Sequence, residues 1–151
     1  MVPYETALQP YREPSRGSAR MTGTQCPPQG AAELRTVAMP ADTNPYGDIF
    51  GGWLLSQMDV AGAAHAMART GGRVATVGIE AMSFHRPVYV GDRVSCHCRT
   101  ERIGRTSITV HVETWVRRAR TGLSPEEIKV TEGMFTYVAL DDAGAKRVIA
   151  R

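Results

Sequence analysis

The most constraining feature of the sequence is a predicted helix over residues 51–70 that is apolar around nearly its whole circumference. Its apolar positions are Trp53, Leu54, Leu55, Met58, Val60, Ala61, Ala63, Ala64, Ala66 and Met67. Gly62 and its alanine neighbours allow a close approach to a sheet, and the pair Gly71 and Gly72 marks the helix end. A helix that is apolar on every side has to be enclosed, so the rest of the fold must wrap it.

The remaining segments predict strands, at residues 33–39, 73–87, 93–103, 105–118 and 129–140. Alternation is plainest in the run 105–118, where Ile108, Val110, Val112 and Val116 face one way and Thr109, His111, Glu113 and Arg117 the other. Short turns predict that the last four strands pair consecutively and antiparallel, as a meander. The expected fold is an α+β domain, an antiparallel sheet wrapped around one long central helix.

Length and composition fit one globular domain. The chain has 151 residues, of which 42% are apolar and 22% charged. Residues 1–32 carry five prolines and no periodicity, which predicts a flexible N-terminal tail before a domain over residues 33–151. No run of about 18 apolar residues and no secretory signal is present, so we expect a cytoplasmic protein without a membrane partner.

Charge and cysteine content exclude several classes. The net charge is +3, but the basic residues are spread along the chain, which does not favour a nucleic-acid partner. Cys26, Cys96 and Cys98 lack the spacing of a metal site, so no metal is predicted. Cys96 and Cys98 lie on one face of a predicted strand, which is poor geometry for a disulfide and favours reduced thiols.

The strongest candidate for chemistry is Asp48, in a glycine-rich turn just before the predicted helix. A helix start offers unpaired backbone N–H groups and a positive dipole end that stabilise an anion. By spacing alone, Asp48 is equally consistent with a helix cap. Asn44 either hydrogen-bonds a substrate or holds the loop through an Asx turn, and the loop role is favoured on physical grounds.

An ordered set of motifs extends over roughly residues 34–140. They are the segments 34–40, 42–44, 47–53, 56–59, 84–88, 90–92, 104–107 and 114–118. In this order and spacing the chain resembles the hotdog-fold acyl-CoA thioesterases, and in particular their YciA-like branch. The resemblance implies a hotdog fold and hydrolysis of acyl-CoA to a free carboxylic acid and CoA. No cofactor is implied, since coenzyme A is part of substrate and product.

The resemblance also implies roles and an assembly. Asp48 matches the family's catalytic carboxylate, as general base or as nucleophile; these two remain open. Backbone N–H groups of Gly51 or Gly52 would polarise the thioester carbonyl. The family forms homo-oligomers in which dimers pair their sheets edge to edge, with sites at the dimer interface, and the branch is generally a hexamer built as a trimer of dimers.

Further residues are expected to bind substrate. Donors to the CoA phosphates would be Gly104, Arg105, Thr106, Ser107, Arg86, Arg117 and Arg118. Ser83 would line the acyl tunnel or the partner's site, and Asp59 is interpreted as structural or interfacial. His65, His97 and His111 have no carboxylate or cysteine at ligand spacing, so no histidine triad is predicted.

Two rivals share the fold. One is a non-hydrolytic acyl-CoA-binding regulatory module, and the other is a dehydratase with a catalytic histidine near the helix start. Asp48 is retained, and no histidine occurs between residues 33 and 64, so the thioesterase is favoured over both. The sequence leaves open the acyl-chain length, the choice between CoA and a carrier protein, and regulation by nucleotides.

Overall fold

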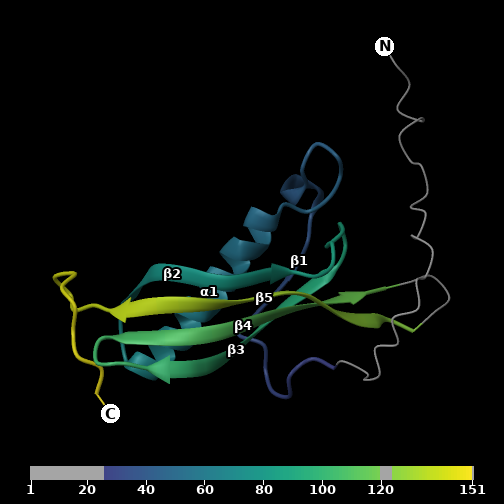
Figure 1. Cartoon of the computed structure of the whole chain (residues 1–151). Helices are drawn as coiled ribbons and strands as arrows, with labels where there is room; N and C mark the ends of the chain where they lie inside the picture. The colour runs from purple at the N-terminus through teal and green to yellow at the C-terminus, as the bar shows by residue number, and fades with distance from the viewer. Residues whose placement is uncertain (1–25, 120–123, 151) are drawn as a thin grey trace.

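The computed structural model describes residues 26–119 and 124–150, and shows one long helix packed against a five-stranded sheet (Figure 1). Its elements are β1 (Leu34–Val37), the 3-10 helix η2 (Pro40–Asp42), α1 (Gly51–Thr70), β2 (Val74–Phe84), β3 (Arg93–Ile103), β4 (Ser107–Arg118) and β5 (Glu126–Ala139). The predicted α+β architecture is confirmed. Most of the predicted tail, residues 1–25, lies outside the described residues.

The strand order differs from the predicted meander. It is β1-β3-β4-β5-β2, and every neighbouring pair is antiparallel. The strands β3, β4 and β5 do pair consecutively, but β2 pairs with β5 and not with β3. The segment after β2 passes the helix start, where the Ile49 N–H donates to the Val88 carbonyl at 3.3 Å, and only then enters β3. The connection that reads as a turn in the sequence is therefore a crossover.

Strand limits also shift. β5 begins at Glu126, three residues before its predicted start, because the β4–β5 ladder continues to the pair Arg118↔Glu126. β4 begins at Ser107, since residues 104–107 form a turn in which the Gly104 N–H donates to the Ser107 carbonyl at 2.8 Å. β1 and β2 are shorter at both ends than predicted, because only residues 34–37 and 74–84 join a ladder.

The core lies between α1 and the inner face of the sheet. The buried helix residues are Leu54, Met58, Ala61, Gly62, His65, Ala66 and Thr70. Of these, Met58, Ala61 and Ala66 belong to one core cluster with Ile108, Val110 and Val112 of β4, whose predicted alternation is confirmed. On the other side of the helix Val60 and Met67 remain 58% and 44% exposed. A single chain therefore encloses one side of α1 and leaves the other open.

Close approach of α1 to the sheet depends on two residues. At Gly62 a Cβ atom would collide with the Tyr137 hydroxyl, so only glycine fits. That hydroxyl donates to the Asp59 backbone carbonyl at 3.0 Å, and the Thr76 hydroxyl donates to the Asp59 carboxylate at 2.7 Å. Asp59 thus ties the helix to β2 and β5, in agreement with its structural interpretation. Gly71 adopts φ 73° and closes the helix through the Met67 carbonyl, as predicted.

Candidate active site

Asp48 lies in a small closed loop before α1. Thr43 and Ile49 form an isolated bridge at its base, and the Asn44 N–H donates to the Asp48 carbonyl at 2.7 Å. The Asn44 side-chain oxygen accepts from the N–H groups of Tyr46 at 2.9 Å and Asp48 at 3.1 Å. Asn44 therefore holds the loop, as the Asx-turn interpretation predicted.

The Asp48 side chain is not a helix cap. The N-cap position of α1 is Phe50, and no side chain caps the helix. Asp48 is exposed, and within residues 26–119 and 124–150 its carboxylate makes no hydrogen bond or ion pair. The alternative that Asp48 caps the helix is therefore wrong. Its carboxylate is exposed near the helix start.

The first turn of α1 has backbone N–H groups that have no acceptor in the described chain. The N–H groups of Trp53 and Leu54 both turn back to the Phe50 carbonyl, whereas those of Gly51 and Gly52 donate to nothing in the described chain. A Cβ at Gly52 would meet open space, and one at Gly51 would touch the Phe84 ring at 3.4 Å. A carbonyl oxygen can therefore approach this helix start and accept a hydrogen bond.

Two of the predicted substrate-binding residues lie near this end of the helix. Ser83 and Arg86 flank Phe84, which contacts Gly51, and both are exposed. Their backbone is fixed by β5: the Thr131 hydroxyl donates to the Ser83 carbonyl at 2.8 Å, and the Arg86 N–H donates to Val130 at 3.3 Å. The described chain thus places Ser83 and Arg86 on the side of Asp48.

The turn at residues 104–107 lies at the opposite end of the molecule (Figure 1). Its backbone carbonyls bind the C-terminal segment, with the Ile149 N–H at 2.9 Å from the Arg105 carbonyl and the Ala139 N–H at 2.8 Å from that of Thr106. Arg147, from the same segment, donates to Thr70 at the end of α1 at 3.4 Å. A helix of 20 residues spans about 30 Å. One chain therefore does not bring Gly104, Arg105, Thr106 and Ser107 to Asp48.

Arg118 has a different partner from the predicted one. Its guanidinium donates two hydrogen bonds to the Asp92 carboxylate, at 2.9 and 2.6 Å. It also donates to the Pro87 carbonyl at 3.2 Å and lies 4.6 Å from the centre of the Tyr89 ring. The hydrogen bond with Asp92 raises the pKa of Arg118. This fork ties β4 to the crossover instead of facing a ligand. Arg117 is exposed, and its Nε lies 3.7 Å from a carboxylate oxygen of Glu127.

Three of the histidines have carboxylate partners that their spacing in the sequence does not show. The buried His65 ring forms two hydrogen bonds, one from Nδ1 to the Glu33 carboxylate at 3.0 Å and one between Nε2 and the Thr100 hydroxyl at 2.9 Å. On the outer face of the sheet, His85 and His111 contact Glu132 at 3.0 and 3.1 Å. These partners are 21 to 47 residues apart in sequence, so local spacing could not reveal them.

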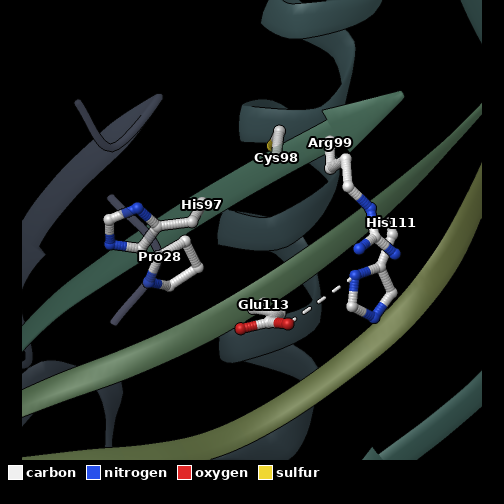
Figure 2. Close-up of a pocket in the computed structure, with 6 residues that line it drawn as sticks. All are labelled: Pro28, His97, Cys98, Arg99, His111 and Glu113. Atoms are coloured by element: carbon white, nitrogen blue, oxygen red, sulfur yellow. Dashed lines mark ion pairs between the residues drawn. The ribbon is translucent and has the colours of Figure 1, made fainter. Parts of the chain in front are cut away.

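A cavity of about 90 Å³ opens on the outer face of the sheet (Figure 2). Its lining consists of Pro28, His97, Cys98, Arg99, His111 and Glu113, none of which is a predicted site residue. Burial raises the pKa of the Cys98 thiol to about 12, so this sulfur stays protonated and is a poor nucleophile. No local sequence pattern indicates this cavity, because its lining comes from β3, β4 and the segment before β1, which meet only in the folded chain.

Comparison with known proteins assigns the family. Residues 46–122, which include Asp48 and all of α1, match the family model of the Thioesterase superfamily. The chain is 49% identical to the acyl-CoA thioester hydrolase YciA of Escherichia coli (strain K12) over 129 residues, which are 85% of this chain and 98% of YciA.

Solved structures agree. The hexameric thioesterase y2039 from Yersinia pestis is 50% identical with a TM-score of 0.74, over 82% of this chain and 98% of that one. The hexameric hotdog fold thioesterase Cj0915 of Campylobacter jejuni is 42% identical with a TM-score of 0.78, over 80% and 91%. The protein belongs to the thioesterase superfamily and has the hotdog fold. Its resemblance to the YciA-like branch of acyl-CoA thioesterases is confirmed.

No helix in the described part of the chain is long and apolar enough to cross a membrane.

Proposed function

We propose that this protein hydrolyses acyl-CoA to a free carboxylic acid and CoA, with Asp48 as the catalytic carboxylate. The observation that carries the proposal is that, within the described residues, the exposed Asp48 side chain has no partner and the N–H groups of Gly51 and Gly52 have no acceptor. The similarity to acyl-CoA thioester hydrolases supports the substrate class.

Two routes use the same groups. In the first, Asp48 takes a proton from water, and the resulting hydroxide attacks the thioester carbonyl. In the second, an Asp48 oxygen attacks the carbonyl itself, and water then hydrolyses the mixed anhydride. In both, the N–H of Gly51 or Gly52 stabilises the tetrahedral oxyanion, and its collapse breaks the C–S bond and expels the CoA thiolate, which takes up a proton. Water is the co-reactant, so the reaction needs no cofactor beyond the CoA of the substrate itself.

Asn44 serves as a positioning residue in this scheme. Its amide oxygen binds the N–H of Asp48, so it fixes the backbone from which the carboxylate projects. A displacement of about 1 Å can cost about 100-fold in rate, so a loop held this closely matters for the chemistry.

The site is completed by a second copy of the chain. Val60 and Met67 are exposed on α1, and Val77 and Ile79 are 60% and 38% exposed on β2, which within the described chain pairs with β5 alone and so has one unpaired edge. Such an apolar, unpaired edge calls for a partner. In an edge-to-edge dimer the partner copy would supply the turn at residues 104–107 as donors to the CoA phosphates. Relatives described as hexameric support a trimer of such dimers.

The substrate-binding roles proposed are those of the predicted residues that remain available. Ser83 lines the acyl site and Arg86 and Arg117 face the CoA, with Gly104, Arg105, Thr106 and Ser107 contributed across the dimer. Arg118 acts indirectly, by holding the crossover through Asp92. The free thiols of Cys26, Cys96 and Cys98 support a location in the reducing cytoplasm.

The direct test is thiol release from a panel of short, medium and long acyl-CoAs by the full chain and by Asp48→Ala. We expect release by the parent protein and its loss in the variant, with unchanged circular dichroism. Binding of acyl-CoA without release by the parent protein would contradict the proposal and favour a non-hydrolytic acyl-CoA-binding module.

A complementation experiment tests the shared site. Asp48→Ala and Arg105→Ala are each expected to be impaired, and when the two are unfolded and refolded together one site in each mixed dimer is intact. Random pairing then restores about a quarter of the parent activity. Mixed dimers that form, shown by a tag on one variant, without any gain in activity would contradict a site built from two chains.

A further inference from the structure

On the outer face of the sheet, two carboxylates stand directly opposite each other. Glu113 of β4 and Glu132 of β5 are register partners, and their side chains are only 21% and 27% exposed. Like charges at directly opposed positions destabilise a sheet, and more so where water is partly excluded. The pair therefore requires a cation between its members.

Each carboxylate has one oxygen held in place and one turned toward a common centre. The Trp115 indole N–H donates to Glu113 Oε2 at 3.1 Å, and His85 Nε2 lies 3.0 Å from Glu132 Oε1. The other two oxygens, Glu113 Oε1 and Glu132 Oε2, face His111. That ring has Nε2 at 3.1 Å from Glu132 Oε2 and Nδ1 at 3.8 Å from Glu113 Oε1. His111, Glu113 and Glu132 each offer one ligand atom, all within 4.8 Å of one another.

The centre already holds a positive charge. Lys129 Nζ lies 2.7 Å from Glu132 Oε2 and 3.6 Å from Glu113 Oε1. The hydrogen bond from Lys129, with smaller contributions from His85 and His111, lowers the pKa of Glu132 to about 2, so the carboxylate is fully ionised at neutral pH. One ammonium against two carboxylates leaves one negative charge uncompensated while the histidines are neutral. A divalent ion in the same place would compensate both.

Space for such an ion and its waters adjoins the cluster. His111 and Glu113 also line the cavity of about 90 Å³ on this face, and Figure 2 shows both side chains at its wall. A cavity of this size holds more than one water, each of which needs two or more polar partners. The long stem of Lys129 lets its ammonium swing away without a backbone change.

We propose that His111, Glu113 and Glu132 form a binding site for a divalent transition metal ion, in competition with the Lys129 ammonium. One imidazole nitrogen and two carboxylate oxygens are ligands that Zn²⁺ accepts, with the remaining positions taken by water. Trp115 and His85 orient the two carboxylates, as partners behind metal ligands commonly do. The site lies on the face of the sheet opposite α1 and does not depend on the proposed hydrolytic activity.

The test is calorimetric titration of Zn²⁺ into the full chain after treatment with a chelator, at pH 7.5. We expect one saturable site per chain. Lys129→Met should tighten binding at least about 10-fold, because it removes the competing cation, and His111→Gln should weaken binding by at least about 10-fold. His97→Gln is the matched control, since His97 lines the same cavity without being one of the three ligands, and it should bind like the parent protein.

Other results would overturn the proposal. They are the absence of saturable Zn²⁺ uptake by folded Lys129→Met, or binding that His111→Gln leaves unchanged. Circular dichroism and gel filtration verify that each variant is folded. Titration of Co²⁺ into Lys129→Met gives a second readout, because its visible absorption should appear with Glu132 present and disappear in Lys129→Met combined with Glu132→Gln.

Discussion

Two Gly-Asp turns in this protein share the φ angle of their glycine but place the aspartate in opposite environments. Gly47 and Gly91 both adopt φ 89°, and each precedes an aspartate. Asp92 has a side chain that is only 4% exposed, accepts from the Tyr89 N–H at 2.9 Å and is gripped by Arg118. Asp48 is exposed and, within the described chain, unpartnered. The same dipeptide is thus used once to stabilise the fold and once to present a carboxylate.

The comparison shows how to separate structural from functional carboxylates. A buried carboxylate must recover its lost hydration through hydrogen bonds and a counter-charge, and Asp92 does so. Asp48 is exposed and keeps its hydration, so the stability of the fold does not require a carboxylate at this position. An acid at this position is what the proposed catalytic role of Asp48 requires.

The largest expected effect is on stability, at Asp92. Asp92→Ala leaves the Arg118 guanidinium without its counter-charge, so we expect the free energy of unfolding to fall by about 3 kcal/mol. Asp48→Ala should change it by less than about 0.5 kcal/mol. Urea denaturation at pH 7 measures both, and equal losses at the two positions would contradict a structural role for Asp92 and not for Asp48.

The next effect is on activity, at Asn44. Asn44→Ala removes the acceptor of two loop N–H groups, so we expect kcat/KM for acyl-CoA to fall about 10- to 100-fold through misplacement of Asp48. Asn44→Asp keeps an acceptor oxygen and should retain more activity. Full activity in Asn44→Ala would show that the loop keeps Asp48 in place without this side chain.

Lowering the pH should remove the stabilisation that the ion-paired Glu132 contributes. The pKa of Glu132 is lowered from its ordinary value to about 2 by Lys129 and by its histidine neighbours. The stabilisation from Glu132 is therefore fully present above about pH 4.5 and is lost as the pH falls toward 2. The difference in melting temperature between the parent protein and Glu132→Gln should shrink over that range. A difference that stays constant from pH 7 to pH 3 would contradict the ion-pair account.

The smallest effect concerns a third residue with positive φ. Ala81 lies in β2 within the irregularity of the β2–β5 register between Glu80 and Ser83, has φ 51° and carries a Cβ that glycines 47 and 91 lack. Ala81→Gly should therefore raise the free energy of unfolding by about 0.5–1 kcal/mol. Ala75→Gly, in the same strand, should lower it by a similar amount. A loss in both variants would mean that the Ala81 side chain contributes contacts that outweigh its strain.

Much of the fold was predictable because its signals are local. The helix at 51–70 came from an apolar pattern with glycines at its end, and the β4 alternation came from a period of two. The β2–β5 pairing was missed because the residues 85–92 look like a turn and give no sign of a crossover. Which strands pair depends on contacts between residues far apart in the sequence, so no short stretch of sequence predicts it.

Part of the candidate site could likewise be predicted from the sequence, and part of it only the structure shows. The place of Asp48 before the helix could be predicted from a Gly-Asp turn leading into an apolar run. The capping role could be rejected only from the structure, since it depends on Phe50 being the N-cap. The Arg118–Asp92 fork and the Glu132–histidine contacts join residues 21 to 47 positions apart, so they too required coordinates.

The most direct test of the central claim compares activity and stability in one variant, Asp48→Asn, which preserves size and loop geometry. We predict that kcat/KM for acyl-CoA falls about 10²- to 10⁴-fold while the free energy of unfolding changes by less than about 0.5 kcal/mol. Retained hydrolysis, or a loss of activity that merely follows a loss of stability, would contradict a catalytic role for Asp48.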